Sequence, residues 1–244
     1  MAAIIELNDV SFSAQDRVIV KNFSHVFEEG RTTALVGPSG CGKSTVLKLS
    51  AGLLVPTDGS VTYHSKDVFT MNRAENLLFR RESAVVFQDS ALWANQSLFQ
   101  SLELPLKIHY PKMTLKEREA RVKDVCAEVG YKRNTDVRPS TLSMGEQKLI
   151  AFARALICRP NLLFLDEWTE SLDETAASRL IKYVEKLQKE KSTVIFVSHD
   201  FRIVRILADY IIMIVAGESN MTLTREQIDT DEELMQYVEA RIAS

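Results

Sequence analysis

The chain has 244 residues, of which 45% are hydrophobic and 26% charged, a balance typical of one large globular domain. Its net charge of −3 disfavours nucleic acid as a partner, and Cys41, Cys126 and Cys158 lack the spacing of a zinc site or a disulfide framework. The N-terminus does not resemble a secretory leader, and the longest apolar run, residues 210–217, is too short to cross a bilayer. We therefore expect any link to a membrane to be made through a partner.

The strands are predicted from two kinds of apolar pattern. Segments rich in β-branched and aromatic residues, separated by polar or Glu-Gly breaks, occur early in the chain at residues 4–12, 17–27 and 32–36. Continuous apolar runs of strand length, as expected for strands buried on both faces, follow at residues 84–87, 162–165, 193–197 and 210–215.

Helical periodicity fills much of the remaining chain. Helices are predicted at residues 43–51, 174–188 and 201–207, and their alternation with strands indicates a parallel α/β core with right-handed crossovers. Residues 89–158 interrupt that alternation with helical patterns at 114–129 and 145–157, so we interpret them as an inserted helical lobe. An amphipathic helix is expected at residues 229–243, with Leu234, Val238 and Ile242 aligned.

The strongest motif is GPSGCGKST, which lies between a predicted strand and a predicted helix in P-loop spacing. Its glycines allow backbone N–H groups to surround phosphate oxygens, Lys43 can reach the β- and γ-phosphates of ATP, and the Ser44 hydroxyl can ligate Mg²⁺. The predicted phosphate-binding residues are Gly37, Pro38, Ser39, Gly40, Cys41, Gly42, Lys43, Ser44 and Thr45. A plain glycine-rich turn is the alternative, and Cys41 is either a tolerated loop residue or a reactive thiol beside Lys43.

An acidic pair follows the apolar run LLFL, at the strand end where open α/β sheets bind ligands. Asp166 is expected to hold Mg²⁺ through water. Glu167 is expected to polarise the attacking water as the general base for displacement at the γ-phosphate. On its own, such a pair could instead serve only as a helix N-cap.

The pentad LSMGE, residues 142–146, resembles the LSGGQ signature of the ABC family of ATPases. That resemblance implies that Ser143 and Gly145 of one subunit close over the γ-phosphate bound by another. Met144 replaces a glycine, which requires a negative φ, and Glu146 replaces the usual glutamine. Ser143 and Glu146 also match an S-x-x-E capping box, and capping alone is the alternative role.

Three single residues extend the resemblance. Gln88 is similar to the family's Q-loop glutamine, which contacts the metal and the attacking water. His199 resembles the switch histidine at the γ-phosphate, and Asp173 the D-loop aspartate that reaches across the dimer. The remaining histidines are interpreted as structural: His25, His64 and His109.

The chain also departs from the family pattern. The position of the aromatic residue that stacks on adenine falls near Ala14, where Phe12 is a possible substitute. Trp168 stands in the place of a proline, and Glu170 in that of a small residue. Whether these exchanges slow turnover stays open, but none removes a phosphate or metal ligand.

The resemblance spans about residues 4–216 and implies the α/β P-loop NTPase fold with a RecA-like, mostly parallel sheet, N-terminal antiparallel strands and an inserted helical lobe. We expect a single domain over residues 1–244, divided into a nucleotide-binding core, a helical subdomain and a C-terminal tail with a helix. The core comprises residues 1–88 and 159–216, the helical subdomain 89–158 and the tail 217–244.

The implied function is that of an ATPase subunit, using ATP and Mg²⁺, which works as a homodimer beneath an integral membrane permease. It would lie peripherally on the cytoplasmic face of the inner membrane. The segment after Gln88 resembles ATPases of MCE-type phospholipid transport, with Leu92, Trp93, Phe99 and Leu104 facing the partner's coupling helix or packing the lobe. An MCE-type or other substrate-binding protein is then a further partner.

Other functions remain open. An amino-acid, ion or lipoprotein transporter is the nearest alternative. A soluble ABC ATPase acting on DNA is disfavoured, because no extended heptads separate Lys43 from Ser143. A nucleotide-gated regulator without turnover would be expected to lack the carboxylate of Glu167.

Overall fold

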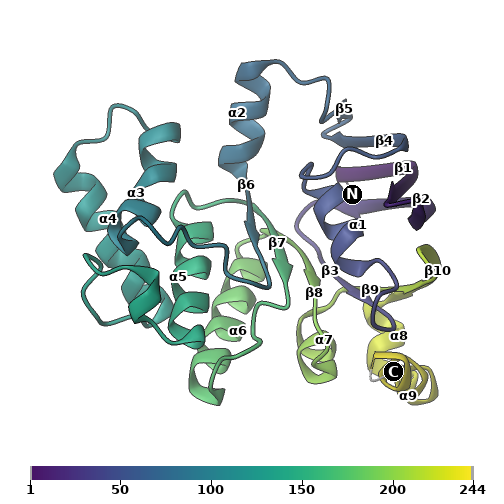
Figure 1. Cartoon of the computed structure of the whole chain (residues 1–244). Helices are drawn as coiled ribbons and strands as arrows, with labels where there is room; N and C mark the ends of the chain where they lie inside the picture. The colour runs from purple at the N-terminus through teal and green to yellow at the C-terminus, as the bar shows by residue number, and fades with distance from the viewer. Residues whose placement is uncertain (1, 243–244) are drawn as a thin grey trace.

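The computed structural model describes residues 2–242, whose strands form a four-stranded and a six-stranded sheet (Figure 1). The smaller sheet is antiparallel throughout and has the order β2-β1-β4-β5. Its strands are β1 (Ala3–Ala14), β2 (Arg17–Glu28), β4 (Asp58–Tyr63) and β5 (Lys66–Asp67). The predicted N-terminal antiparallel strands are confirmed, and β4 and β5 complete their sheet.

The larger sheet has the order β10-β9-β3-β8-β7-β6, and all its neighbours are parallel except β10 and β9. Its strands are β3 (Thr32–Val36), β6 (Ser83–Val86), β7 (Leu162–Asp166), β8 (Thr193–Val197), β9 (Tyr210–Val215) and β10 (Glu218–Thr224). Every residue of β7 and β8 is buried, as their apolar runs predicted, and so is every residue of β3. The expectation was wrong for β6, because it is an edge strand in which Ala84 and Val85 stay partly exposed.

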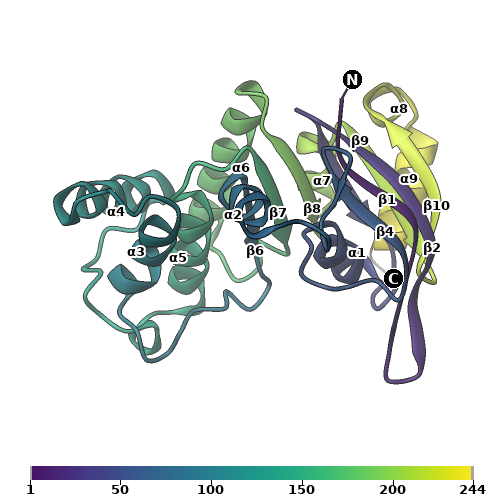
Figure 2. The same ribbon diagram turned by 90° about the horizontal axis from the view of Figure 1, so that it is seen from above.

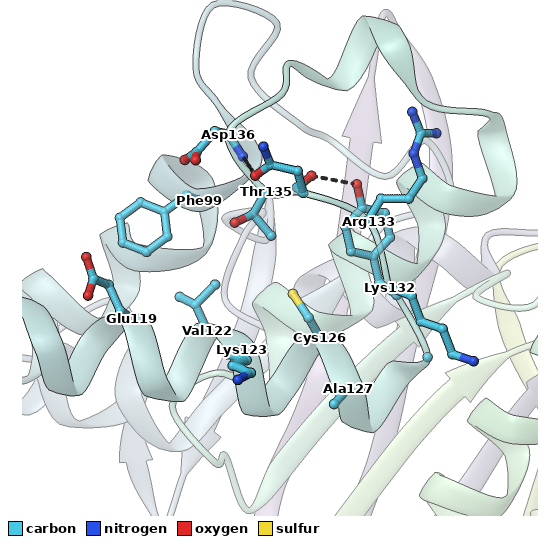
Figure 3. Close-up of a pocket in the computed structure, with 13 residues that line it drawn as sticks. Phe99, Glu119, Val122, Lys123, Cys126, Ala127, Lys132, Arg133, Thr135 and Asp136 are labelled. Carbon is cyan, nitrogen blue, oxygen red and sulfur yellow. Dashed lines mark hydrogen bonds between the residues drawn. The ribbon is translucent and has the colours of Figure 1, made fainter.

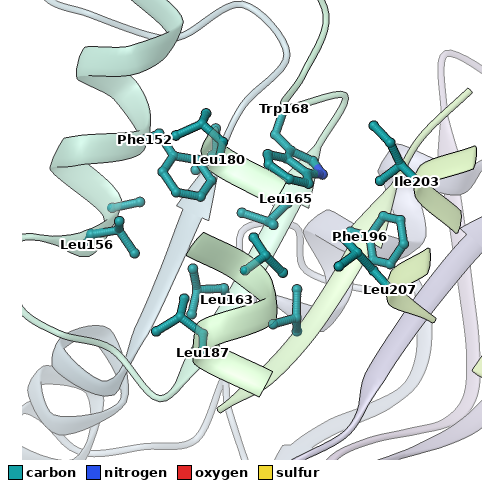
Figure 4. Packing of buried hydrophobic residues seen from close by; sticks show 14 of the residues in the cluster. Phe152, Leu156, Leu163, Leu165, Trp168, Leu180, Leu187, Phe196, Ile203 and Leu207 are labelled. Carbon is teal, nitrogen blue, oxygen red and sulfur yellow. The ribbon is translucent and has the colours of Figure 1, made fainter. Parts of the chain in front are cut away.

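Two apolar clusters cover the two faces of this sheet. On one face α1 (Lys43–Ser50) and the small sheet pack against residues such as Phe164. On the other, α6 (Glu174–Lys189) and α7 (Phe201–Leu207) pack together with the helical lobe. Trp168 is fully buried in this second cluster and stacks on Phe152 with ring centroids 5.6 Å apart (Figure 4). This stack joins the loop after β7 to the lobe.

The helical lobe contains α3 (Leu98–His109), α4 (Leu115–Val129), the 3-10 turn Pro139–Thr141 and α5 (Met144–Leu156). In both views it lies at one end of the molecule and the small sheet at the other, with the large sheet between them (Figures 1 and 2). Sequence analysis did not find α3 or α2 (Arg73–Glu82). Both begin with capping boxes, Ser97 with Gln100 and Asn72 with Glu75, and these signals could have located them.

The C-terminal segment joins the core. After β10 come α8 (Arg225–Thr230) and α9 (Glu232–Ile242), whose Met235, Val238 and Ile242 are buried in the second cluster. The helix expected at 229–243 therefore begins three residues later, and Ala243 lies outside the described residues. Among the residues that the structure describes, no helix combines the length and the apolarity needed to cross a membrane.

Candidate functional site

The P-loop connects β3 to α1, and its path depends on glycine. Gly37 and Gly42 have φ values of 144° and 105°. A Cβ atom at Gly37 would lie 2.1 Å from the carbonyl oxygen of Ile214, and one at Gly42 would lie 2.9 Å from that of Ile19. Any side chain at these positions would therefore push the loop away from β2 and β9. At Gly40 the Cβ position is open but φ is 73°, which also favours glycine.

Lys43 closes the loop upon itself. The residue is 7% exposed, and its ammonium donates hydrogen bonds to the carbonyl oxygens of Gly37 at 2.8 Å and Pro38 at 2.9 Å. The positive charge is thus held inside the ring of residues 37–43, beside the N-terminus of α1. This arrangement suits an anion with several oxygens, because both the ammonium and the helix N-terminus favour negative charge. Ser39 lies in the same loop, and Thr45 is half-buried in the first turn of α1.

A hydroxyl and a carboxylate meet where α1 faces the end of β7. Ser44 Oγ donates to Asp166 Oδ1 at 2.8 Å, and Asp166 is buried. Gln88 follows β6, the neighbour of β7, and lines the same cavity of about 550 Å³. Because Mg²⁺ prefers hydroxyl, carboxylate and amide oxygens, this donor set fits the ion. The structure thus brings together Ser44, Gln88 and Asp166, which the sequence predicted as metal ligands.

Glu167 lies directly after β7 in a left-handed conformation, with φ of 43°. Its backbone N–H donates to Val197 on β8, and one carboxylate oxygen, Oε2, accepts from the backbone N–H of His199 at 3.2 Å. The other oxygen, Oε1, is 3.3 Å from His199 Nε2 but has no aligned hydrogen bond within residues 2–242. Burial raises the pKa of Glu167, while His199 opposes the rise. A buried acceptor without a donor and with a raised pKa has the properties of a general base.

The signature pentad begins α5 in the predicted manner. Ser143 Oγ accepts from the Glu146 backbone N–H at 3.2 Å, and a Glu146 carboxylate oxygen accepts from the Ser143 N–H at 2.9 Å, so the capping box is confirmed. Met144 is the first helical residue, 71% exposed and not left-handed, so no glycine is needed there. At Gly145 a Cβ would approach the carbonyl oxygen of Ser171 to 3.0 Å.

Ser143, Gly145 and Asp173 do not line the cavity beside Ser44. Asp173 caps α6, where its side chain accepts from the backbone N–H of Ala176 at 2.8 Å. Ser143 and Asp173 are exposed on the single chain, and Gly145 is partly exposed. Within residues 2–242, none of the three forms a described hydrogen bond with the P-loop. Their predicted role requires a second subunit.

Cys41 lies inside the P-loop with 8% of its surface exposed. Burial raises the pKa of its thiol, although Lys43 acts in the opposite direction. A neutral, enclosed thiol favours the interpretation of a tolerated loop residue over that of a reactive one. Burial also lowers the pKa of His25 to about 4, so this imidazole is uncharged at neutral pH.

Sequence analysis missed two basic side chains on α5 that hold the segment following β6. Lys148 is 2% exposed, and its ammonium donates to the carbonyl oxygens of Phe87 at 3.3 Å and of Gln88. The Arg154 guanidinium donates to the carbonyl oxygens of Ala91 at 2.7 Å and Ser90 at 3.2 Å. It also lies 5.6 Å from the ring centre of Trp93. Basic residues on the buried face of a predicted helix were the available signal.

Two further cavities lie away from the P-loop. One of about 460 Å³ is lined by Trp93 and Leu104, two of the four residues predicted to face a partner. Leu92 and Phe99 pack, partly buried, against the core of the lobe, which agrees with the packing alternative for these two residues. The other cavity, of about 630 Å³, lies between α4 and residues 131–136 (Figure 3). No P-loop residue lines it, so it is not the phosphate site.

Comparison with known proteins places this geometry in context. Residues 20–170 match the family described as ABC transporter. YejF of Escherichia coli K12, called an uncharacterized ABC transporter ATP-binding protein, is 38% identical over 82% of this chain and 39% of its own length. The nickel import ATP-binding protein NikE of Shigella flexneri is 34% identical over 84% of this chain and 77% of its own length. The chain therefore spans less than two thirds of YejF but most of NikE.

Solved structures agree with these sequence relatives. The ATP-binding cassette MJ0796, a dimer in a post-hydrolysis state with ADP and Pi, superposes with a TM-score of 0.85 at 27% identity, over 91% of this chain and 99% of that one. CbiO1 of Clostridium perfringens, part of the complex cbiONQ, gives 0.77 at 26% identity, over 100% and 97%. The predicted α/β fold with a P-loop, an antiparallel N-terminal sheet and a helical lobe is therefore confirmed.

Proposed function

The chain belongs to the ABC transporter family of ATPases, and from that premise we propose that two copies bind and hydrolyse ATP face to face to drive transport through a separate membrane subunit. One observation carries the proposal. The P-loop, the Ser44–Asp166 contact and the Glu167–His199 contact all lie at the carboxyl ends of adjacent strands β3, β7 and β8. Phosphate, metal and attacking water would therefore meet at one edge of the sheet.

ATP binding is assigned to the P-loop. The backbone N–H groups of Gly37 and residues 39–45 would surround the phosphates, and the Lys43 ammonium would exchange the carbonyls of Gly37 and Pro38 for phosphate oxygens. Mg²⁺ would be held by Ser44, Gln88 and Asp166, the last through water. When bound, this ion neutralises charge on the β- and γ-phosphate oxygens. Phe12 lies in β1, partly buried against the first apolar cluster, and is our candidate for contact with adenine, in place of Ala14.

Hydrolysis follows from Glu167. Its buried carboxylate accepts a proton from water as the water oxygen attacks the γ-phosphorus and the bond to the β,γ-bridging oxygen breaks, giving ADP and phosphate. His199 is 51% exposed at its side chain and close to Glu167, so it can contact the γ-phosphate while its backbone N–H orients the base. Trp168, the residue after Glu167, fixes the turn that follows β7 through its stack on Phe152.

Dimerisation completes the site. We propose that Ser143 and Gly145 of one subunit close over the nucleotide of the other, and that Asp173 reaches across the same interface. The exposure of Met144 and Asp173 on the single chain supports this, and MJ0796 is described as a dimer. Within each copy, residues 1–88 and 159–216 would act as the nucleotide-binding core, 89–158 as the helical subdomain and 217–244 as the tail.

The membrane partner would dock on the cavity lined by Trp93 and Leu104, which lies between the lobe and β6. Trp93 and Ile108 there are 45% and 50% exposed, which suits the apolar side of a short helix. A subunit held in this way lies on the cytoplasmic face of the inner membrane without spanning it.

For the cargo we propose phospholipid of the MCE type, on the ground that the segment after Gln88 resembles the ATPases of those systems. A second candidate, a metal ion, is favoured by the 34% identity to NikE, which is named for nickel import. The test is to copurify the membrane protein that binds this chain and to identify its bound ligand by mass spectrometry. Lipid supports the first proposal, and nickel without lipid supports the second.

The ATPase role itself is tested by measuring phosphate release from Mg-ATP by the chain alone and with its copurified membrane partner. We expect hydrolysis that rises on adding the partner in lipid. Absence of hydrolysis in both samples, with ATP bound, would contradict the assignment of Glu167 and the transport role.

A further inference from the structure

We propose that Glu170 is a positioning residue for Gln88, because it determines which end of the Gln88 amide faces the metal cavity. The inference rests on the function proposed above and concerns the same site. Glu170 stands where the family has a small residue, and it lies in the loop between Glu167 and Asp173. Its carboxylate, Gln88 and Asp166 line one cavity.

The contact itself has a defined direction. Gln88 Nε2 donates a hydrogen bond to Glu170 Oε2 at 3.1 Å. An ionised carboxylate can only accept, so it binds the NH₂ end of the amide and leaves the carbonyl oxygen, Oε1, for another partner. Mg²⁺ requires oxygen and cannot use the NH₂ group. Glu170 therefore selects the amide orientation that can ligate the ion.

The backbone of Gln88 is fixed independently. The buried Lys148 ammonium donates to the carbonyl oxygens of Phe87 and Gln88. Burial lowers the pKa of Lys148, and the carboxylates around it, with Glu170 foremost, oppose that shift. With the backbone held from α5 and the amide held from Glu170, the Gln88 side chain has few orientations left to lose when the ion arrives.

The same loop touches the dimer-facing helix. The carbonyl oxygen of Ser171, next to Glu170, is the closest atom to the position of a Cβ on Gly145. A shift of α5 would therefore reach the Gln88 amide through residues 170 and 171. This gives the metal ligand a direct connection to the surface that receives the second subunit.

The experiment compares Glu170→Gln and Glu170→Ala with the control Glu174→Gln. Glu174 is exposed in the first turn of α6, so its substitution by glutamine removes the same charge outside the cavity. Affinity for Mn²⁺ is measured by electron paramagnetic resonance with ADP bound, and nucleotide affinity by calorimetry in EDTA. We expect the Glu170 variants to weaken Mn²⁺ binding by about 10-fold or more, as for loss of one hydrogen bond to a charged group. Metal-free ADP binding and the Tm should stay unchanged.

A double-mutant cycle shows whether the effect passes through Gln88. In a Gln88→Ala background, Glu170→Gln should cause no further loss of Mn²⁺ affinity. An equal loss in both backgrounds would mean that Glu170 acts by charge alone, and it would overturn the inference. Unchanged Mn²⁺ affinity in both Glu170 variants would overturn it too, with the proposed function intact. Failure of the unmodified chain to bind Mn²⁺ with ADP would instead overturn the proposed function and this inference with it.

Discussion

The P-loop and the segment that follows β6 face the same cavity but are held in different ways. The P-loop is fixed by backbone packing, since Gly37 and Gly42 press against carbonyl oxygens of β9 and β2 and Lys43 is bonded within the loop. Residues 87–91 are held by the long side chains of Lys148 and Arg154, and Gln88 by Glu170. Backbone packing leaves one arrangement, whereas side-chain contacts can be exchanged. We therefore call the P-loop, residues 37–45, the preformed region. Residues 87–91 are the adjustable region, because they keep their arrangement only while the side chains of Lys148, Arg154 and Glu170 keep theirs.

The largest loss of turnover is expected when Glu167, the proposed general base, is substituted. Glu167→Gln keeps the shape and the bond from the His199 N–H but cannot accept a proton, so turnover should fall by roughly 10²-fold or more. Because we expect Lys43, Ser44 and Asp166 still to bind Mg-ATP, the variant should accumulate as an ATP-bound dimer. Light scattering at high concentration with Mg-ATP and with Mg-ADP measures this.

The pH dependence gives the control for this variant. Burial raises the pKa of Glu167, so the protonated, inactive form persists to higher pH than for an ordinary glutamate. Hydrolysis by the unmodified chain should therefore decline as pH falls, starting above the usual glutamate range, and Glu167→Gln should lack that decline. A variant that hydrolyses ATP at the original rate would show that another group is the base.

The next largest effect is expected on nucleotide affinity, from a substitution within the preformed region. Lys43→Ala removes the charge that the loop encloses, and we expect nucleotide affinity to fall by about 10- to 10²-fold, the range for lost charge-assisted bonds. Titration with a fluorescent ATP analogue provides the measurement, with Lys182→Ala, an exposed lysine on α6 outside the cavity, as the control. Unchanged nucleotide affinity in Lys43→Ala would show that the P-loop does not bind the phosphates.

Sequence analysis located the P-loop and the acidic pair correctly in the fold, for a physical reason. The P-loop is one continuous stretch of sequence, and so is the Asp166–Glu167 pair. Each follows a buried parallel strand, and the ends of such strands meet at one edge of a sheet. The contacts of Gln88 with Glu170 and Lys148 join residues 60 or more positions apart, and no local pattern encodes them. Strand β10 was missed because ESNMTLT is polar, and α3 because Pro105 lies within it.

A smaller effect is expected in the adjustable region. Arg154→Ala removes both bonds to the carbonyls of Ser90 and Ala91 and the contact with Trp93. Amide hydrogen exchange should accelerate by about 10-fold at residues 89–93, because hydrogen bonds to a charged group contribute about 1.5 kcal/mol or more. The P-loop amides should keep their rates.

The control for that experiment is Arg205→Ala, which breaks a surface pair with Glu232 away from both regions. It should leave exchange at residues 89–93 unchanged. Equal acceleration in the P-loop and in residues 89–93 of Arg154→Ala would mean that the two regions open together, and the contrast between them would fail.

The smallest effect is expected at Cys41, the thiol inside the preformed loop. Its 8% exposure and raised pKa both slow alkylation before any nucleotide is present, and the rate should keep rising as pH passes the usual thiol range, because only the thiolate reacts. Bound Mg-ATP encloses the loop further, so labelling should slow by only about 2- to 5-fold, within the range of small local effects. Peptide mapping after timed alkylation measures each cysteine, and Cys126 and Cys158, whose pKa values burial raises to about 11, are internal controls outside the P-loop. Equal labelling of Cys41 with and without Mg-ATP would show that the nucleotide does not occupy the loop. Protection of all three cysteines alike would show that ATP tightens the whole chain, so that the phosphate site is not preformed.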